Sequence, residues 1–205
     1  MYPVEALDRL IVNEMRADLG TTVIGREIIV LEQTGSTNDA ILRIATSNSK
    51  EGLVLFAEHQ TEGRGQRGNR WESAAGKGLW FSILLQPRID INNSPRLTTW
   101  AAEAISDLIQ NEFSLKATIE LPNDVEIDGR KVAGVLVEMR AQEKAPHLAI
   151  AGIGINVNQS LEDFPRELQS RAISLAMALD RKVDRRKFAN ALLRNLDRSY
   201  RERFC

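Results

Sequence analysis

Glycine and arginine alternate in a short polar stretch near residue 65, and these two residue types together suit the binding of an anion. Residues 63–68 read GRGQRG, and Trp71 follows them. Glycine lets the backbone take a positive φ and approach a ligand closely, while each arginine guanidinium offers a planar fork of donors to a carboxylate or a phosphate. The stretch therefore predicts an anion-binding loop.

The spacing of this stretch is also that of a dinucleotide-binding loop, G-x-G-x-x-G, which has to open a helix at the end of a strand. Here a second glycine pair, Gly76 and Gly78, leads into the apolar run 79–85, which has the composition of a strand. The loop thus joins two strands, and a dinucleotide site is disfavoured. A kinase phosphate loop joins two strands as well, but the chain lacks the His-Arg-Asp and Asp-Phe-Gly sequences of a kinase. A long hairpin with basic, solvated tips stays open as the alternative.

Three neighbouring polar residues stand at a predicted junction between a strand and a helix. Ser36, Thr37 and Asn38 lie between the apolar run 27–32 and the helical stretch 40–45. One of them is enough to cap the helix. The others are candidates for ligand contacts at the N-terminus of the helix.

A lone cation begins an otherwise apolar strand in the second half of the chain. Lys131 opens the run KVAGVLVEM, after a hairpin turn predicted at residues 128–129. Strict alternation places Lys131 on the face of Ala133 and places Gly134 on the opposite face. The Lys131 ammonium group is a second candidate for binding an anion, and a strand-end lysine that reaches into water is the alternative.

The composition limits which kinds of protein this chain can be and which kinds of partner it can bind. The 205 residues are 43% hydrophobic and carry 27 basic and 28 acidic side chains, so the chain is long enough for one large domain and has no overall field to attract nucleic acid. The sequence shows neither a membrane span nor a signal peptide. The single cysteine, Cys205, and two well-separated histidines give no metal-site spacing. We expect a cytoplasmic protein with no metal-binding cluster and with no nucleic-acid or membrane partner.

Hydrophobic periodicity predicts the elements that must position these residues. Apolar residues at helical spacing predict helices, and alternating or continuous apolar runs predict strands. The expected helices are 3–20, 40–45, 97–112, 174–179 and 187–200. The expected strands are 27–32, 52–58, 79–86, 117–121, 125–127, 131–139 and 147–156, with 125–127 resuming 117–121 after a break.

Five motifs, in this order, carry a resemblance to a known family. They are Ser36-Thr37-Asn38, the glycine loop within residues 58–71, Pro122-Asn123-Asp124, the strand 130–138 and the run GIGIN at 152–156. In order and approximate spacing they resemble the biotin protein ligases, which activate biotin as biotinyl-adenylate and transfer it to a lysine of a carrier domain. The match runs almost from end to end of the chain.

The resemblance implies a fold and an extent. The catalytic domain of the family is an α+β fold, a mixed β-sheet flanked by helices, related to the class II aminoacyl-tRNA synthetases and the lipoate ligases. Residues 1–205 would be a single catalytic domain of this kind. It would be a minimal form, without the N-terminal helix-turn-helix DNA-binding domain of some members and the small C-terminal β-domain of most. Dimers formed through the sheet are common in the family, so a homodimer is compatible with it.

The resemblance also implies roles for particular residues. Arg64 and Lys131 would be catalytic, holding the biotin carboxylate and the phosphate that joins it. ATP would bind with Mg²⁺ bridging its phosphates, and the other partners would be biotin and a biotin carboxyl carrier domain. The substrate-binding residues would be Ser36, Thr37, Asn38, Gln60, Gly63, Arg64, Gly65, Gln66, Arg67 and Gly134. The residues on the ATP side would be Trp71, Asn123, Asp124 and Asn156.

The chain departs from the family pattern just before Pro122. Most members have Lys-Trp there, whereas this chain has Glu120 and Leu121. A carboxylate about 4 Å from a phosphate would oppose binding by about 4 kcal/mol at an effective dielectric near 20. Two alternatives stay open: a lipoate or octanoate ligase or transferase on the same fold, and a biotin-binding protein without catalytic activity.

Overall fold

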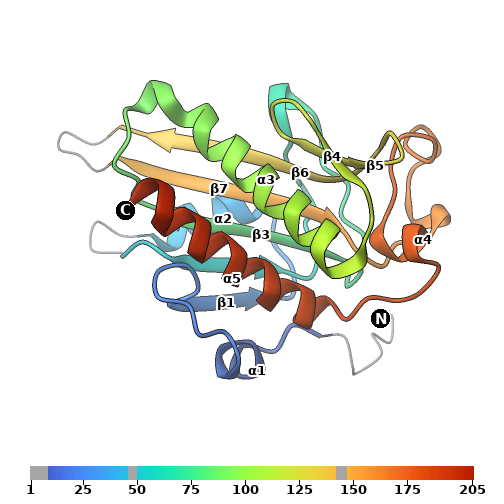
Figure 1. Cartoon of the computed structure of the whole chain (residues 1–205), viewed down its shortest axis with the longest axis horizontal. Coiled ribbons are helices and arrows are strands. Elements are labelled where there is room, and N and C mark those ends of the chain that lie inside the picture. Colours follow the sequence, from blue (N-terminus) through green and yellow to red (C-terminus); the bar gives the residue numbers. More distant parts are fainter. Residues whose placement is uncertain (1–8, 46–49, 142–146) are drawn as a thin grey trace.

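The computed structural model describes residues 9–45, 50–141 and 147–205, and this part of the chain forms a seven-stranded sheet flanked by helices (Figure 1). The strands are β1 (Glu27–Leu31), β2 (Leu53–Ala57), β3 (Gly78–Leu85), β4 (Ala117–Glu120), β5 (Asp124–Ile127), β6 (Arg130–Arg140) and β7 (Leu148–Asn156). The helices are α1 (Val12–Ala17), α2 (Thr37–Ile44), α3 (Ser94–Phe113), α4 (Leu175–Leu179) and α5 (Arg185–Phe204). The sheet has the order β1-β2-β3-β7-β6-β5-β4. β1 and β2 are parallel and the other neighbours are antiparallel, so the predicted mixed sheet of an α+β fold is confirmed.

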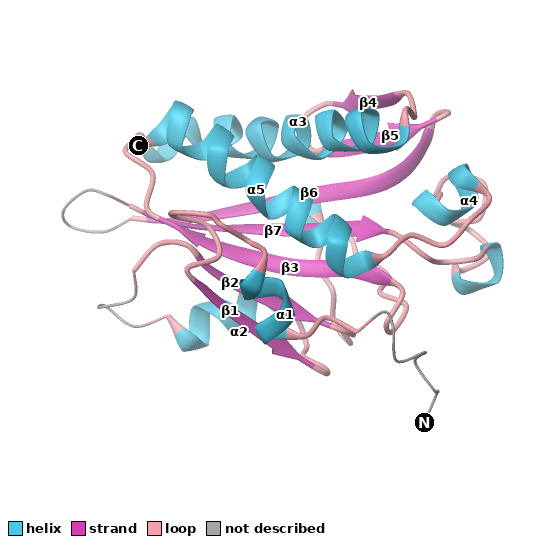
Figure 2. Ribbon diagram, turned by 60° about the horizontal axis from the view of Figure 1, so that its bottom comes forward, coloured by secondary structure: helices cyan, strands magenta, loops and turns pink. Residues whose placement is uncertain are grey.

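Helices α3 and α5 cover one face of the sheet, as Figure 2 shows. Their apolar sides bury Trp100, Ile105, Leu192 and Tyr200, each at most 1% exposed. The rings of Trp100 and Tyr200 pack with their centroids 5.4 Å apart. Side chains of this size remove the largest apolar areas from water, so this layer is the main hydrophobic core.

Helix α2 packs on the opposite face of the sheet. Its apolar side is short, and Ala40 and Ile41 meet Leu55, Leu84 and Ile150 in a small second cluster. Its first turn is buried although it is polar, since Thr37 and Asn38 are at most 4% exposed. The start of α2 therefore brings hydrogen-bonding side chains against the centre of the sheet.

Strand β6 departs from regular pairing at its first residues. Against β5 the pairing slips by one residue between Lys131 and Ala133, so Val132 is left over as a β-bulge. One extra residue reverses the alternation of the side chains on either side of it. Lys131 therefore shares a face with Gly134, and its Cε lies 3.1 Å from the position that a Cβ on Gly134 would take. The alternation expected from the sequence is wrong at this residue.

Two other elements differ from the sequence-based expectation. β5 does not resume β4 but returns antiparallel to it, with Ala117 opposite Ile127, because residues 121–123 form a turn. The first helix begins at Val12, and residues 1–8, where the predicted helix starts, lie outside the described residues. The predicted turn at residues 128–129 is confirmed, with φ of 52° and 68°.

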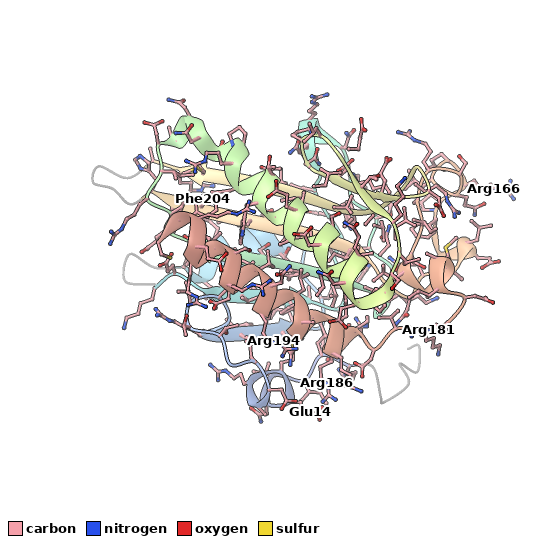
Figure 3. All side chains as sticks on the ribbon, viewed as in Figure 1. Glu14, Arg166, Arg181, Arg186, Arg194 and Phe204 are labelled. Carbon is pink, nitrogen blue, oxygen red and sulfur yellow. The ribbon has the colours of Figure 1, made fainter. Side chains whose placement is uncertain are left out.

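Helix α5 also holds the segment that precedes β1. The carboxylate of Asp197, 3% exposed, accepts two consecutive backbone N–H groups, those of Val23 and Ile24, each at 2.8 Å. Nearer its start, α5 forms an ion pair from Arg186 to Glu14 of α1, and Figure 3 shows these two side chains between the helices. The segment from α1 to the start of β1 is thus fixed by polar contacts with α5 as well as by its own apolar side chains.

Candidate functional site

Three glycines on the neighbouring strands β6 and β7 leave part of the α2 face of the sheet without side chains of its own. We call this area the glycine floor. Gly134 of β6 pairs with Gly154 of β7, and Gly152 lies two residues earlier on β7. A Cβ on Gly134 or Gly154 would overlap the ring of Trp71. A Cβ on Gly152 would overlap the side chain of Asn38. The glycines therefore give Trp71 and Asn38 room to lie directly on the sheet.

A pocket opens above this floor, and most of the predicted site residues line it. They are Ser36, Thr37, Asn38, Gln60, Arg64, Gly65, Gln66, Trp71, Asn123, Lys131 and Gly134. Sequence reasoning did not include the remaining lining residues, which are Val135, Leu136, Gly152, Ile153 and Gly154. Segments that are far apart in the sequence thus meet at one place.

Four predicted residues do not line the pocket. Gly63 is buried in the backbone of the glycine loop, and Arg67 is exposed at the tip of that loop with a φ of 57°. Asp124 is outside the lining but bonds to two residues that line the pocket, Asn123 and Lys131. Asn156 is 4% exposed, and its side chain bonds to other residues of the protein.

The glycine loop has the backbone of a small hairpin. The N–H of Trp71 donates to the carbonyl of Gly63 at 2.9 Å, which closes the loop at its base. Arg67 and Arg70 are exposed, as in the alternative of a hairpin with basic, solvated tips. Arg64 is exposed as well, but unlike these two it also lines the pocket.

One part of the pocket lining is an uncharged hydrogen-bonding network. The backbone N–H and the hydroxyl of Thr37 lie 2.8 and 3.1 Å from Gln60 Oε1. The hydroxyl of Ser82, which is fully buried on β3, lies 2.8 Å from Thr37 Oγ1 and 2.6 Å from Asn38 Oδ1. Sequence reasoning missed Ser82, although a lone hydroxyl in the apolar run LWFSILL was a signal. The network fixes the Thr37 and Asn38 side chains as donors and acceptors for an uncharged polar ligand group.

Arg64 and two carboxylates lie beside this network. The Arg64 guanidinium donates to Asp39 at 2.7 Å and to the two oxygens of Glu138 at 2.9 and 3.2 Å. Glu138 also accepts a hydrogen bond from Asn38 Nδ2 at 2.7 Å. The cluster has one more negative than positive charge, so an incoming anion is repelled there unless a carboxylate moves away from Arg64. Glu138 and Asp39 were not predicted as site residues.

Lys131 supplies the second cation of the site. Its ammonium lies 2.7 Å from Asp124 Oδ2 and 5.1 Å from the centroid of the Trp71 ring. Asn123 donates to the other Asp124 oxygen at 2.6 Å. A carboxylate and an aromatic face thus hold the Lys131 ammonium over the glycine floor.

Glu120 and Leu121, where the chain departs from the family pattern, lie beside this pair. Glu120 is opposite Asp124 in the β4–β5 ladder, so their side chains are on the same face of the sheet. Glu120 is exposed and does not line the pocket, and Leu121 is 72% exposed. The acidic side chain is therefore on the pocket's side of the sheet but outside its lining.

An ion pair stands where the glycine loop rejoins β3. Lys77 Nζ lies 2.7 and 2.5 Å from the two carboxylate oxygens of Asp163. Partial burial opposes ionisation of Asp163, but hydrogen bonds from Lys77 and from Ser160 outweigh it and lower the pKa of Asp163 below its ordinary value. The folded protein therefore favours the charged form of this carboxylate.

Within residues 9–45, 50–141 and 147–205, the side chains of His, Cys, Asp and Glu do not gather in a group of three or more that could hold a metal ion. In the same part of the chain, no helix has both the length and the apolar character needed to cross a membrane.

Comparison with known protein families and sequences finds matches across most of the chain. The model of the biotin/lipoate A/B protein ligase family matches residues 30–156. The bifunctional ligase/repressor BirA of Bacillus subtilis is 38% identical over 190 residues, which are 93% of this chain and 58% of that protein. The biotin–[acetyl-CoA-carboxylase] ligase of Mycobacterium tuberculosis is 33% identical over 177 residues, which are 84% of this chain and 63% of that protein. The chain thus spans less than two thirds of the length of these relatives.

Comparison with solved structures finds the same fold. The biotin protein ligase of Aquifex aeolicus, in complex with biotin and ATP, superposes with a TM-score of 0.73. It is 30% identical in sequence, over 87% of this chain and 73% of that chain.

Proposed function

Because the chain belongs to the biotin/lipoate A/B protein ligase family, we propose that it activates biotin with ATP and transfers it to a protein. The first step forms biotinyl-5′-AMP and releases pyrophosphate. The second step moves the biotinyl group to a lysine of a biotin carboxyl carrier domain. The names of the similar proteins, which include a biotin–[acetyl-CoA-carboxylase] ligase and a biotin protein ligase crystallised with biotin and ATP, support this choice.

The observation that carries the proposal is that one pocket combines an uncharged hydrogen-bonding network with two cations. Thr37, Asn38 and Gln60 form the network. Two cations line the same pocket: Arg64, which Glu138 joins to Asn38, and Lys131, which lies beside Gly134. Biotin combines the same features, since an uncharged ureido ring is joined by an aliphatic chain to a carboxylate.

The first step brings two anions together, and the proposed catalytic residues address this difficulty. The biotin carboxylate attacks the α-phosphate of ATP, a new C–O–P link forms, and the bond to pyrophosphate breaks. The nucleophile is already an anion, so no general base is required. Arg64 and Lys131 offset the repulsion between the anions and stabilise the charge that develops on the phosphate oxygens. Arg64 exchanges the carboxylate of Asp39 or Glu138 for the ligand anion as it does so.

The nucleotide is proposed to lie on the side of the pocket formed by Trp71, Asn123 and Asp124. Mg²⁺ in nucleotide sites is usually held by one or two carboxylates and by the phosphates themselves. Asp124 is a carboxylate at this position, and Asn123 presents an amide next to it. These two residues would hold the ion together with ATP, and the ion would supply positive charge to the phosphates.

In the second step the amine of the acceptor lysine attacks the acyl carbon of the adenylate, an amide forms and AMP leaves. The pocket must therefore remain open to a large partner.

We also propose that residues 1–205 act as a single catalytic domain in the cytoplasm, where ATP is available. Whether two copies associate is open to measurement by sedimentation.

Pyrophosphate release tests the proposal directly. The protein is mixed with ATP and either biotin, lipoate or octanoate, and a carrier domain is then added and analysed by mass spectrometry. We expect release that depends on biotin, followed by a mass increase of one biotinyl group on the carrier. Release with lipoate or octanoate instead would identify the alternative ligase. Binding of biotin without release of pyrophosphate would identify a biotin-binding protein and contradict the proposed enzyme.

A further inference from the structure

Helix α5 begins with a charged side chain that is completely buried. Arg185, its first residue, is 0% exposed, and its partner Glu58 is 8% exposed. Arg185 Nη1 donates to Glu58 Oε2 at 2.7 Å and to the carbonyl of Gly78 at 3.0 Å. The other oxygen of Glu58 accepts the N–H of Leu10 at 3.2 Å. Charged side chains are seldom buried to this degree unless they are paired, and the proposed reaction has no use for this pair.

The two residues that Arg185 joins stand at the two ends of the glycine loop. Glu58 directly follows β2, and Gly78 is the first residue of β3. The pairing of β2 with β3 ends at Ala57 and Trp80, so the two ends of the loop lie beyond the ladder. A backbone bond from the Gly76 N–H to the Glu58 carbonyl, at 2.9 Å, and the Arg185 guanidinium link them there.

This link acts on the pocket from the other face of the sheet. Arg185 belongs to α5, which covers the face opposite the glycine floor (Figure 2). The loop between Glu58 and Gly78 contributes Arg64 and Trp71 to the pocket lining. The loop also has its own hydrogen bond at its base, between Trp71 and Gly63. A shift of its two ends would therefore move the loop as a body and displace the side chains that line the pocket.

Stability alone is a weak reason for an ion pair at this depth. Removing two charges from water costs nearly as much as their attraction returns, and apolar side chains of similar volume can often replace such a pair without loss of stability. Removing one partner is different, because the other charge is left buried and unpaired. The effects of the pair on stability and on the position of the loop can therefore be separated by substitution.

We propose that Arg185 is a positioning residue for the glycine loop. By joining Glu58 to Gly78 it fixes the two ends of the loop and thereby the place of Arg64 and Trp71 over the glycine floor. It acts through the loop and does not contact the ligands. The inference rests on the proposed function for the role of the pocket, but the placement of the loop can be measured without that function.

The first test compares a single with a double substitution. Arg185→Met leaves the Glu58 carboxylate without this partner, whereas Arg185→Met with Glu58→Leu removes both charges. We expect the double variant to have the higher denaturation midpoint of the two. Both should release pyrophosphate about 10- to 100-fold more slowly than the wild type, because a catalytic group displaced by about 1 Å can cost about 10²-fold in rate. A rate that recovers together with the stability would overturn the positioning role.

Hydrogen exchange in the ligand-free protein tests the placement of the loop without any enzyme activity. The Gly76 N–H is bonded at the base of the loop, and the N–H of Ile105, a buried residue of α3, reports on the core. In the double variant we expect exchange at Gly76 to rise about tenfold relative to exchange at Ile105. The nuclear magnetic resonance signal of the Trp71 indole N–H should also shift. Equal rises at Gly76 and Ile105 would show a general loss of stability, and unchanged exchange at Gly76 would show that Arg185 does not hold the loop. Either result contradicts the inference.

Asn190→Ala is the matched control, because Asn190 is another buried polar residue of α5. It is 5% exposed and donates to the carbonyl of Met15 at 3.1 Å, outside the glycine loop. It should keep the wild-type rate and the wild-type exchange at Gly76, and losses equal to those of Arg185→Met would contradict a specific role for Arg185.

Two further outcomes keep the inference separate from folding and from the proposed function. If the double variant does not fold, Arg185→Lys keeps the charge on a shorter side chain and should show the same changes in smaller measure; a wild-type rate and wild-type exchange at Gly76 would then overturn the inference. Absence of pyrophosphate release from the wild type would contradict the proposed function alone, since the exchange at Gly76 still decides whether Arg185 holds the loop.

Discussion

The two faces of the sheet differ in the size and polarity of the side chains that cover them. On the face of α3 and α5, large side chains such as Trp100 and Tyr200 are completely covered. On the face of α2, the same strands present glycines, and the space above them is occupied by polar side chains and a pocket. Alternation along one strand separates the two sets, since Ile155 of β7 enters the core and Gly154 forms the floor.

The contrast indicates that one face provides most of the stability and the other provides the recognition. Apolar burial stabilises in proportion to the area removed from water, and the glycine floor has little to contribute. A polar network contributes less to stability but fixes where its atoms lie. Substitutions on the two faces should therefore have effects that can be separated by experiment.

The largest expected effect is on the helical face. Trp100→Ala should lower the free energy of unfolding by about 3–5 kcal/mol, because it removes a fully buried ring and leaves a cavity. Denaturant unfolding measures the loss, and biotin titration at low temperature should give the wild-type affinity. A loss of biotin affinity of tenfold or more in the folded variant would break the separation of the two faces.

The second largest effect should come from a substitution on the pocket face, and it should change the reaction rate but not the stability. Lys131→Ala is expected to slow pyrophosphate release by about 10²- to 10³-fold, the usual result of removing one donor that stabilises a transition state. Its unfolding free energy should change by less than about 1 kcal/mol, because the side chain is 34% exposed. Lys187→Ala, on α5, is the control and should leave the rate unchanged. Near-normal release from Lys131→Ala would refute its catalytic role.

A methyl group on the floor should disturb binding more than folding. Gly154→Ala would place a Cβ in the Trp71 ring, and overpacking of this kind costs about 1–3 kcal/mol. The ring can be displaced into the pocket, so we expect weaker biotin binding and a changed tryptophan fluorescence. Gly35→Ala is the matched control, since its nearest neighbouring atom would be 3.5 Å from the new Cβ. Equal effects of the two substitutions would contradict the role of the floor.

The smallest effect concerns an ion pair that belongs to neither face. The pKa of Asp163 is lowered in the folded protein, so the stabilisation is present above the ordinary carboxylate pKa of about 4 and is lost as the pH falls through the lower, folded value. The pair is partly exposed and should contribute at most about 1 kcal/mol. Between pH 5 and pH 3 the wild type should lose slightly more stability than Asp163→Asn. Parallel pH profiles for the two proteins would show that the pair contributes nothing.

The fold and much of the pocket could be predicted because their signals are local. The apolar runs gave the order of the strands and helices, and the glycine loop, Ser36 and Lys131 stand out by residue type alone. The bulge at Val132 could not be predicted, because a strand one residue out of register has the same sequence as a regular one. It decides the face on which Lys131 lies.

The missed residues of the pocket are those whose partners come from another part of the chain. In the sequence Glu138 is only an acid within a strand. Its partners in the structure, Asn38 and Arg64, come from α2 and the glycine loop. Ser82 is a single polar residue in an apolar strand until Asn38 packs against it. The sequence at residues 121–123 does not show whether β5 continues in the direction of β4 or turns back along it. Only the antiparallel pairing of β5 with β4 distinguishes the two.

The contacts between α5 and the segment before β1 have a consequence for the order of events during synthesis. Asp197 accepts hydrogen bonds from the Val23 N–H, and the two residues are 174 positions apart. At about 5–20 residues per second, a ribosome needs about 9–35 s to make the intervening chain. Through that interval the backbone N–H groups of this segment remain hydrated. Residues 22–24, which leave the ribosome early, are therefore among the last to complete their hydrogen bonds, and a stall in translation before α5 would leave these N–H groups without Asp197.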